Sequence, residues 1–111
     1  MQAGDIVLIE MLQSDGNYKL RPALILKPLP KYNDFLVCGI STQIHQYIKD
    51  FDEILNESDF HFTKTGLNKT SLIRLSFIAV VPSANIFGSI GKLQPLLLKE
   101  LLQRLSTFLV S

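Results

Sequence analysis

The chain has few of the residues that mark specialised protein classes. Cys38 is the only cysteine among its 111 residues, so no internal disulfide can form and a reducing cytoplasm is the expected location. The only histidines, His45 and His61, do not have the spacing of a metal site. No glycine-rich phosphate-binding pattern occurs either. We therefore expect no disulfide scaffold, no bound metal or cofactor and no nucleotide-binding loop.

Long apolar runs and an excess of one charge are also missing. No apolar run reaches about 18 residues, and residues 1–12 lack a basic leader with a long apolar core, so we expect no membrane span and no signal peptide. The net charge of +1 gives no long-range attraction for nucleic acid. RNA binding would depend on two local basic clusters, which are Lys19, Arg21, Lys27 and Lys31, and Lys64, Lys69 and Arg74.

What is present is the composition of a packed globule. Apolar residues make up 47% of the chain and charged residues 19%, and the length suits one domain covering residues 1–111. A domain of this size can build one core without metal or disulfide support. The composition is slightly apolar for a monomer, which favours a homodimer.

Three strand segments are predicted in the first half of the chain, at 4–11, 19–27 and 34–42. The turn sequence Asp15-Gly16-Asn17 separates the first two, and Pro28 ends the second. The connections are too short for crossover helices, so antiparallel pairing of neighbours is expected.

The second half is predicted to contain shorter strands. These lie at 52–55, 71–74 and 77–81, with a tight bend at Leu75-Ser76 between the last two. A helical turn is expected at Ser83, where the glycines that follow make a long helix unfavourable.

The clearest predicted element is a helix near the end of the chain. Pro95 suits its first position. Leucines and a phenylalanine at three- and four-residue steps form a broad apolar face, made of Leu97, Leu98, Leu101, Leu102, Leu105, Phe108 and Leu109. Such a face needs a sheet or a partner to cover it. The predicted fold class is therefore mainly β, a small curved antiparallel barrel closed by one C-terminal α-helix.

Two segments could carry chemistry. Proline biases the residue before it to extended geometry, so Pro22 holds Arg21 at the lip of the sheet as an anion clamp; the alternative is a surface arginine paired with an acid such as Asp15. Ser41, Thr42 and Gln43 follow a buried run, with Thr42 expected on the opposite face from its neighbours. A hydroxyl beside a guanidinium could stabilise a phosphorane-like charge. The alternative is an ordinary polar strand end with a Ser/Thr turn.

Several motifs together resemble one known family. GDIV near the start, RPALIL, a strand that closes on ISTQI, TSLIRLSFIAVV and GSIGKLQPLLLKELLQRL follow in the order found in MazF/PemK toxins of type II toxin–antitoxin systems. The resemblance implies an SH3-like barrel with helical additions. It also implies a homodimeric, metal-independent endoribonuclease of single-stranded RNA, whose cognate antitoxin blocks the RNA groove.

The same resemblance implies roles for individual residues. Arg21 matches the catalytic arginine of the family, and an alignment without gaps places the catalytic threonine at Ser41, with Thr42 one step along. Gln43 would contact a base or a phosphate. The remaining RNA-binding residues are expected to be Lys19, Lys64 and Lys69.

Two departures from the family pattern keep other functions open. The turn after the first strand carries only one basic residue, and the acidic stretch at 50–59 would repel phosphates unless it lay on another surface. One alternative is a non-catalytic growth inhibitor on the same barrel, similar to the CcdB toxins that bind DNA gyrase. Another is an inactive module that only binds a partner.

Overall fold

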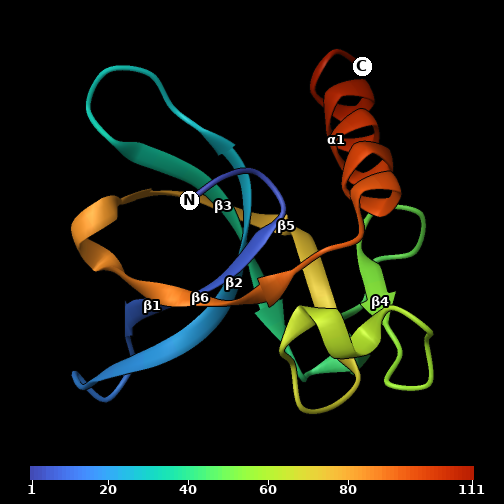
Figure 1. Ribbon diagram of the computed structural model, residues 1–111, viewed down its shortest axis with the longest axis horizontal. Coiled ribbons are helices and arrows are strands. Elements are labelled where there is room, and N and C mark those ends of the chain that lie inside the picture. The colour runs from blue at the N-terminus through green and yellow to red at the C-terminus, as the bar shows by residue number, and fades with distance from the viewer.

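The first three strands form a meander, as the turn and proline signals predict. The computed structural model describes residues 1–111 and shows six antiparallel strands in one sheet, curled into a half-barrel (Figure 1). The strands are β1 Asp5–Leu12, β2 Tyr18–Pro28, β3 Asp34–Ser41, β4 Glu53–Leu55, β5 Ser71–Pro82 and β6 Ile86–Lys92. Their order in the sheet is β4-β5-β3-β2-β1-β6. Short helical turns η1 Ile44–Gln46, η2 Phe62–Thr65 and η3 Ser83–Asn85 and the helix α1 Pro95–Leu109 complete the chain.

β5 is one strand with a bulge, where the sequence predicted two pieces separated by a bend. Cys38 of β3 lies opposite Ile78, but its neighbour Gly39 lies opposite Arg74. Residues 75–77 therefore have no register partner on β3, because three extra residues are inserted at the predicted bend. The position of the bend was predicted correctly, and the continuity of the strand was not.

β6 was not predicted from the sequence. The helical turn expected at Ser83 is present as η3, and β6 then pairs with β1 along the edge of the sheet. Gly88 and Gly91 lower the strand propensity of this segment, since glycine is unfavourable in strands. The register of β6 against β1 shifts twice, so its pairing depends on tertiary contacts that the sequence pattern does not reveal.

The sheet is closed where η2 packs against β6. Gly66, just after η2, has a positive φ of 73°, and a Cβ there would overlap the carbonyl of Ile90. A Cβ at Gly91 would overlap the backbone of Thr65. Glycine at both positions lets the two backbones touch, which brings the loop after η2 next to the first strands.

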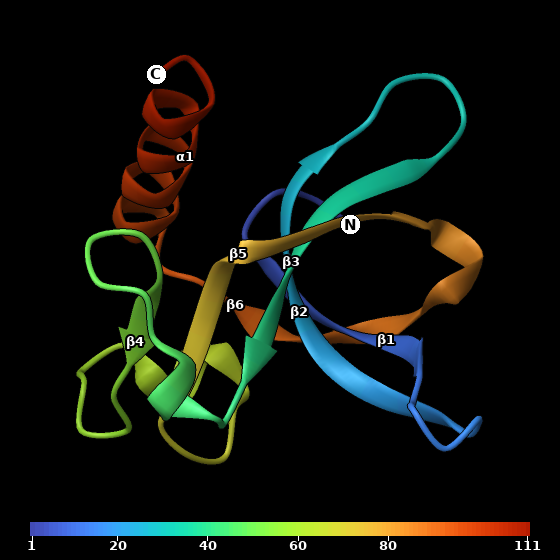
Figure 2. The same ribbon diagram turned by 180° about the vertical axis from the view of Figure 1, so that it is seen from behind.

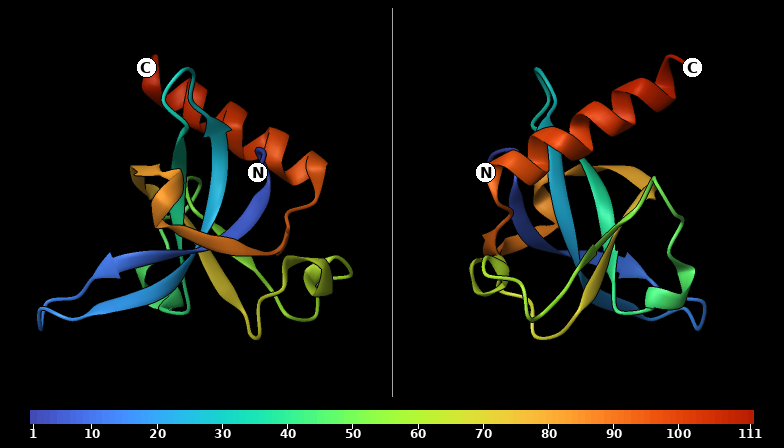
Figure 3. Two further views of the ribbon diagram at one scale, coloured as in Figure 1. Left: turned by 60° about the vertical axis from the view of Figure 1, so that its left-hand side comes forward. Right: turned by 90° about the vertical axis from the view of Figure 1, so that its right-hand side faces the viewer.

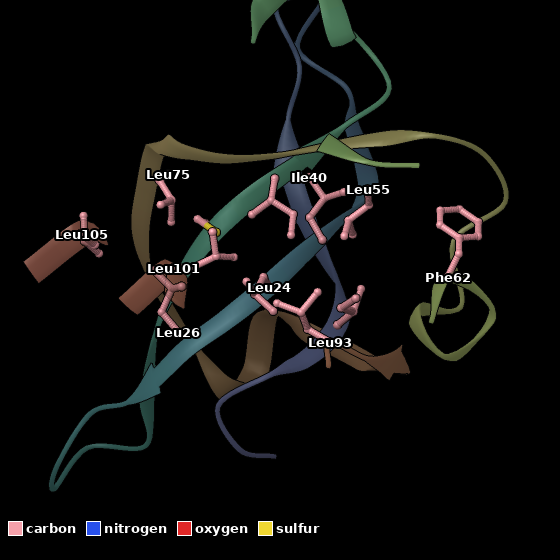
Figure 4. Close-up of a cluster of buried hydrophobic side chains, with 12 residues drawn as sticks. Leu24, Leu26, Ile40, Leu55, Phe62, Leu75, Leu93, Leu101 and Leu105 are labelled. Atoms are coloured by element: carbon pink, nitrogen blue, oxygen red, sulfur yellow. The ribbon is translucent and has the colours of Figure 1, made fainter. Parts of the chain in front are cut away.

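Strand alternation gives the sheet two buried faces. One face contributes to a cluster of Ile6, Leu24, Leu26, Cys38, Ile40, Leu55, Phe62, Ile73, Leu75, Leu93, Leu101 and Leu105, drawn in Figure 4. The other face buries Val7, Ile9, Ala23, Ile25, Phe35, Val37 and Val81. Successive side chains of β1 and β2 thus enter different clusters, as a two-residue period requires.

The helix α1 covers the first cluster with only part of its apolar face. It crosses above the curled sheet in the side views (Figure 3), and Leu101 and Leu105 are buried. Phe108 and Leu109, predicted on the same face, remain 58% and 65% exposed because the helix extends beyond the sheet. No helix has the length and apolar character that crossing a membrane requires.

Candidate active site

Most of the candidate residues line a single groove at one end of the half-barrel. This groove, with a volume of about 630 Å³, lies between the start of β2, the end of β3, the loop after η2 and the bulge of β5. Its charged and key polar residues are Arg21, Ser41, Thr42, Gln43, Lys69 and Arg74. We call it the basic groove, because three cations and no carboxylate line it.

Arg21 lies at the edge of the sheet, in the part of β2 that does not pair with β3. Its backbone pairs with Ile9 of β1, but pairing with β3 begins only at Ala23, after Pro22. The exposed guanidinium donates one hydrogen bond, from Nη2 to Gln13 Oε1 at 3.0 Å. Both ion pairs in the structure use another arginine, so the proposed pairing of Arg21 with Asp15 is wrong. Arg21 keeps donors free for an anion.

The Asp15 carboxylate is instead occupied within its own turn. Its Oδ1 accepts a hydrogen bond from the backbone N–H of Asn17 at 2.9 Å, and Gly16 between them has a φ of 86°. This is an Asx turn, which forms the tip of the β1–β2 hairpin and leaves the carboxylate away from the arginine. Figure 2 shows this hairpin on the opposite side of the molecule from α1.

The polar end of β3 brings two hydroxyl groups to the groove. Ser41 is half-buried, and its Oγ accepts a hydrogen bond from the backbone N–H of Gln43 at 3.0 Å. The Ser/Thr turn expected as the structural alternative is therefore present. Because β3 ends at Ser41, strand alternation no longer applies, and Thr42 lines the same groove instead of facing away as predicted.

Arg74 is the functional candidate to which the sequence argument gave no role beyond a basic cluster. It is half-buried in the wall of the basic groove, and its Nε is buried without a hydrogen-bond partner. The guanidinium carbon lies 5.7 Å from the ring centroid of Phe77, within the range of a cation–π contact. The signal that could have identified it is a charged residue inside the apolar run SLIRLSF.

Phe77 forms a second feature of this wall. Its ring is 42% exposed and packs over Gly39, where a Cβ would lie 3.3 Å from Phe77 Cδ1. Gly39 therefore leaves room for the ring against β3. The groove thus offers an aromatic ring next to Arg74.

The predicted lysines are divided between the groove and other surfaces. Lys69 lines the basic groove, but Lys19, on the exposed part of β2, and Lys64, in η2, do not. The acidic stretch at 50–59 contributes no side chain to the groove, as expected for a phosphate-binding surface.

The chain can now be compared with known proteins. A family model described as "PemK-like, MazF-like toxin of type II toxin-antitoxin system" matches residues 2–109. The chain belongs to this toxin family. The match confirms the resemblance seen in the motifs of the sequence.

Solved structures support the same fold for this toxin. The Mycobacterium tuberculosis toxin MazF-mt6 superposes with a TM-score of 0.70 at 19% identity, covering 96% of each chain. An endoribonuclease in complex with its cognate antitoxin from mycobacterial species gives 0.68 at 14% identity, covering 99% of this chain and 95% of that one. No curated protein matches in sequence. At these identities, the structural likeness establishes the fold.

The other reactive side chains of the toxin lie outside the groove. Cys38 is fully buried, and burial together with the negative charge of Asp52 raises the pKa of its thiol to about 12. The thiol is therefore neutral and inaccessible, as expected for a small buried apolar residue. His45 is exposed in η1 and does not line the groove. The groove's chemistry is thus that of guanidinium, ammonium, hydroxyl and amide groups.

A second hollow lies between α1 and the bulge of β5. It has a volume of about 1180 Å³ and is lined in part by Phe51, Ile78, Phe108 and Leu109, so we call it the helix groove. Its one arginine, Arg104, donates from Nη1 to the carbonyls of Phe51 and Asp52 at 2.9 and 3.2 Å. From Nη2 it donates to Glu53 and Glu100 at 3.1 and 2.9 Å.

Proposed function

We propose that this toxin is an endoribonuclease that cleaves single-stranded RNA in the basic groove without a metal ion. The observation that carries the proposal is the meeting of Arg21 and Arg74 with the hydroxyls of Ser41 and Thr42 in one groove free of carboxylates. A scissile phosphate needs cationic donors that are not already occupied. Arg21 makes one hydrogen bond, and the guanidinium of Arg74, whose Nε is buried, makes none.

The reaction is an attack of the ribose 2′-hydroxyl on the adjacent phosphorus. The new O2′–P bond forms as the P–O5′ bond breaks, and the proton lost by the 2′-hydroxyl is balanced by one gained at the leaving oxygen. The products are a 2′,3′-cyclic phosphate and a 5′-hydroxyl. Arg21 assists this proton transfer and stabilises the phosphorane, and Arg74 supplies a second fixed cation. DNA lacks the attacking group and is not cleaved.

Ser41 is the better placed of the two hydroxyls. Its Oγ is held by the N–H of Gln43, which occupies the oxygen and leaves the hydroxyl proton free to point into the groove. A donor fixed before the substrate arrives needs no reorganisation during the reaction. The hydroxyl of Thr42 lines the groove without such a contact and plays a secondary role.

RNA is gripped by amide, amine and aromatic groups around this centre. Gln43 contacts a base or a phosphate, and Lys69 binds a phosphate from the loop side of the groove. Lys19 and Lys64 lie beyond the lining and add only the electrostatic attraction of neighbouring phosphates. An unstacked base can rest on the exposed ring of Phe77, which favours single-stranded substrates.

Two protein partners follow from the family and the surface. One solved relative is an endoribonuclease in complex with its cognate antitoxin, and we infer that a cognate antitoxin covers the basic groove here. Exposed apolar side chains of β5 and α1, including Ile78, Val80 and Leu109, support a homodimer. We further infer that residues 1–111 act as one domain in the cytoplasm, where the buried free thiol of Cys38 stays reduced.

The proposal is tested by incubating the protein with RNA in excess EDTA. Wild type should cleave, Arg21→Ala should lose at least about a hundredfold in rate, and RNA with 2′-deoxyribose at the cleaved position should stay intact. The exposed position of Arg21 predicts that its removal leaves the melting temperature almost unchanged. Intact RNA with wild type, or equal rates for both proteins, rejects the assignment; captured gyrase with intact RNA would favour a non-catalytic inhibitor.

A further inference from the structure

A buried carboxylate joins two segments that each run on into the basic groove, although its own partners, Ile48 and Ser76, line the helix groove. Asp52 is only 1% exposed, and no cation contacts its carboxylate, since Arg104 bonds only its main-chain carbonyl. Its Oδ2 accepts a hydrogen bond from the N–H of Ile48 at 3.1 Å, and its Oδ1 accepts one from the N–H of Ser76 at 3.1 Å. The hydroxyl of Ser76 donates to both oxygens, at 3.2 and 3.3 Å.

The donors to this carboxylate come from two separate segments. Ile48 belongs to the loop that leaves β3 after Gln43, and Asp52 also closes a turn there, donating its own N–H to the carbonyl of Ile48 at 2.9 Å. Ser76 is the middle residue of the β5 bulge, between Arg74 and Phe77 of the groove wall. One side chain thus links the loop after β3 to the bulge that presents a cation and an aromatic ring.

The bulge lacks the strand pairing that holds the rest of β5. Residues 75–77 have no register partner on β3, and β4 pairs only with residues 71–73. A buried carboxylate is unfavourable unless hydrogen bonds compensate it, and here it accepts them from the backbone N–H groups of Ile48 and Ser76. An apolar residue would deprive both N–H groups of this acceptor, so the acid fixes the backbone of the bulge.

We propose that Asp52 is a positioning residue for the groove, acting through Ser76 to hold the β5 bulge so that Arg74 and Phe77 face the RNA. This inference rests on the proposed nuclease function for its catalytic consequence. Its structural part stands on the hydrogen bonds alone. Asp52 itself touches no substrate, because it does not line the groove.

The experiment compares Asp52→Asn and Ser76→Ala with two controls. In Asp52→Asn, an amide N–H₂ must face either the N–H of Ile48 or that of Ser76, so one contact becomes repulsive. Ser76→Ala removes only the hydroxyl and keeps the backbone contact, and it provides a second test should Asp52→Asn fold poorly. Glu53→Gln removes the neighbouring acid, and Leu105→Ala lowers stability on the helix side, without changing the Asp52–Ser76 contact.

Two readouts separate this inference from the proposed function. In protein labelled with fluorophenylalanine, the fluorine NMR signal of Phe77, assigned with Phe77→Leu, should shift in Asp52→Asn, shift less in Ser76→Ala and stay in place in both controls. In RNA cleavage, Asp52→Asn should lower kcat on the order of 10- to 100-fold with a much smaller change in KM. Each control should keep the kcat of wild type per folded molecule.

The fluorine NMR and cleavage results together decide between the positioning role of Asp52 and its catalytic consequence. An unmoved Phe77 signal in Asp52→Asn, or an equal shift in the controls, overturns the positioning role. Wild-type kcat in Asp52→Asn, with active wild type, overturns its catalytic consequence and leaves the nuclease function standing. If wild type cleaves no RNA, the proposed function fails instead, and the fluorine signal still decides whether Asp52 sets the bulge.

Discussion

The basic groove and the helix groove differ most in how their arginines are used. Arg104 in the helix groove donates four hydrogen bonds: two tie α1 to the carbonyls just before β4, one reaches Glu53 of β4, and one stays within α1 at Glu100. In the basic groove, Arg21 donates one to Gln13, and Arg74 has a buried Nε with no partner. A guanidinium with four of its five donors engaged within the protein holds the fold together. One with donors to spare is prepared for an anion.

The apolar surroundings of the two grooves also indicate different partners. The helix groove leaves Phe108 and Leu109 exposed beside Phe51, a surface that suits another protein chain. The basic groove has one aromatic side chain, Phe77, in a lining of aliphatic and polar residues. We therefore assign RNA, and the antitoxin that would cover its site, to the basic groove, and self-association to the helix groove.

The largest effect should come from replacing the arginine of each groove with alanine, one groove at a time. Arg74→Ala should lower kcat for RNA by about 10²- to 10³-fold, since it removes a cation at the developing charge. Arg104→Ala should leave kcat per folded molecule unchanged and should lower the melting temperature instead. Single-turnover cleavage and thermal melting check both; equal catalytic losses would remove the distinction between the two arginines.

The next effect separates the two halves of α1. Leu101→Ala should lower the free energy of unfolding by roughly 3 kcal/mol, because Leu101 is fully buried in the core. Leu109→Ser should change that free energy little and should instead weaken self-association. Denaturant unfolding and sedimentation measure the two quantities. A large loss of stability with Leu109→Ser in the monomer would mean that the helix groove is not a protein contact surface.

A smaller effect distinguishes the two hydroxyls of the basic groove. Ser41→Ala should slow cleavage by about 10- to 100-fold and Thr42→Ala by clearly less, because only Ser41 is held by the N–H of Gln43. Ser41→Thr keeps the hydroxyl and should retain most of the rate. Initial rates under saturating RNA provide the comparison, and the reverse ranking would assign the donor role to Thr42.

The effect that is smallest near neutral pH, and grows only in alkali, concerns Cys38, which is buried in the first core cluster. Its thiol pKa is raised from an ordinary value of 9.0 to about 12, chiefly by burial and further by the charge of Asp52. The unfolded thiol therefore ionises first, and stability should fall as the pH rises from 9 towards 12, by about 1.4 kcal/mol per pH unit. Unfolding of wild type and Cys38→Ala across this range isolates the contribution. Identical pH slopes would contradict it.

The elements predicted well are those with local signals. The turn at Gly16, the prolines after β2 and the leucine spacing of α1 specified the meander and the helix without tertiary information. β6 was not predicted because it contains two glycines, one of which, Gly91, makes a contact with η2 that only the folded chain shows. β6 pairs with β1 from the other end of the chain and contacts η2 in a separate loop, and neither contact can be inferred from a local pattern.

Only the part of the candidate site that comes from β2 and β3 was predicted from the sequence. The Arg21–Pro22 pair and the hydroxyls after β3 could be found because strand ends carry polar groups that no core requires. Arg74 was hidden in an apolar run, and its place in the groove depends on the bulge of β5. The role of Asp52 was similarly invisible, since its donors lie in separate segments of the chain.

The most direct test of the account is to map where RNA binds. Amide NMR spectra of wild type, titrated with a single-stranded RNA blocked by 2′-O-methyl groups, should show shifts at Ser41, Gln43, Lys69 and Arg74. Signals from Phe51 and Phe108 in the helix groove should remain in place. Shifts confined to the helix groove, or no shifts at saturating RNA, would contradict the assignment of the basic groove as the nuclease site.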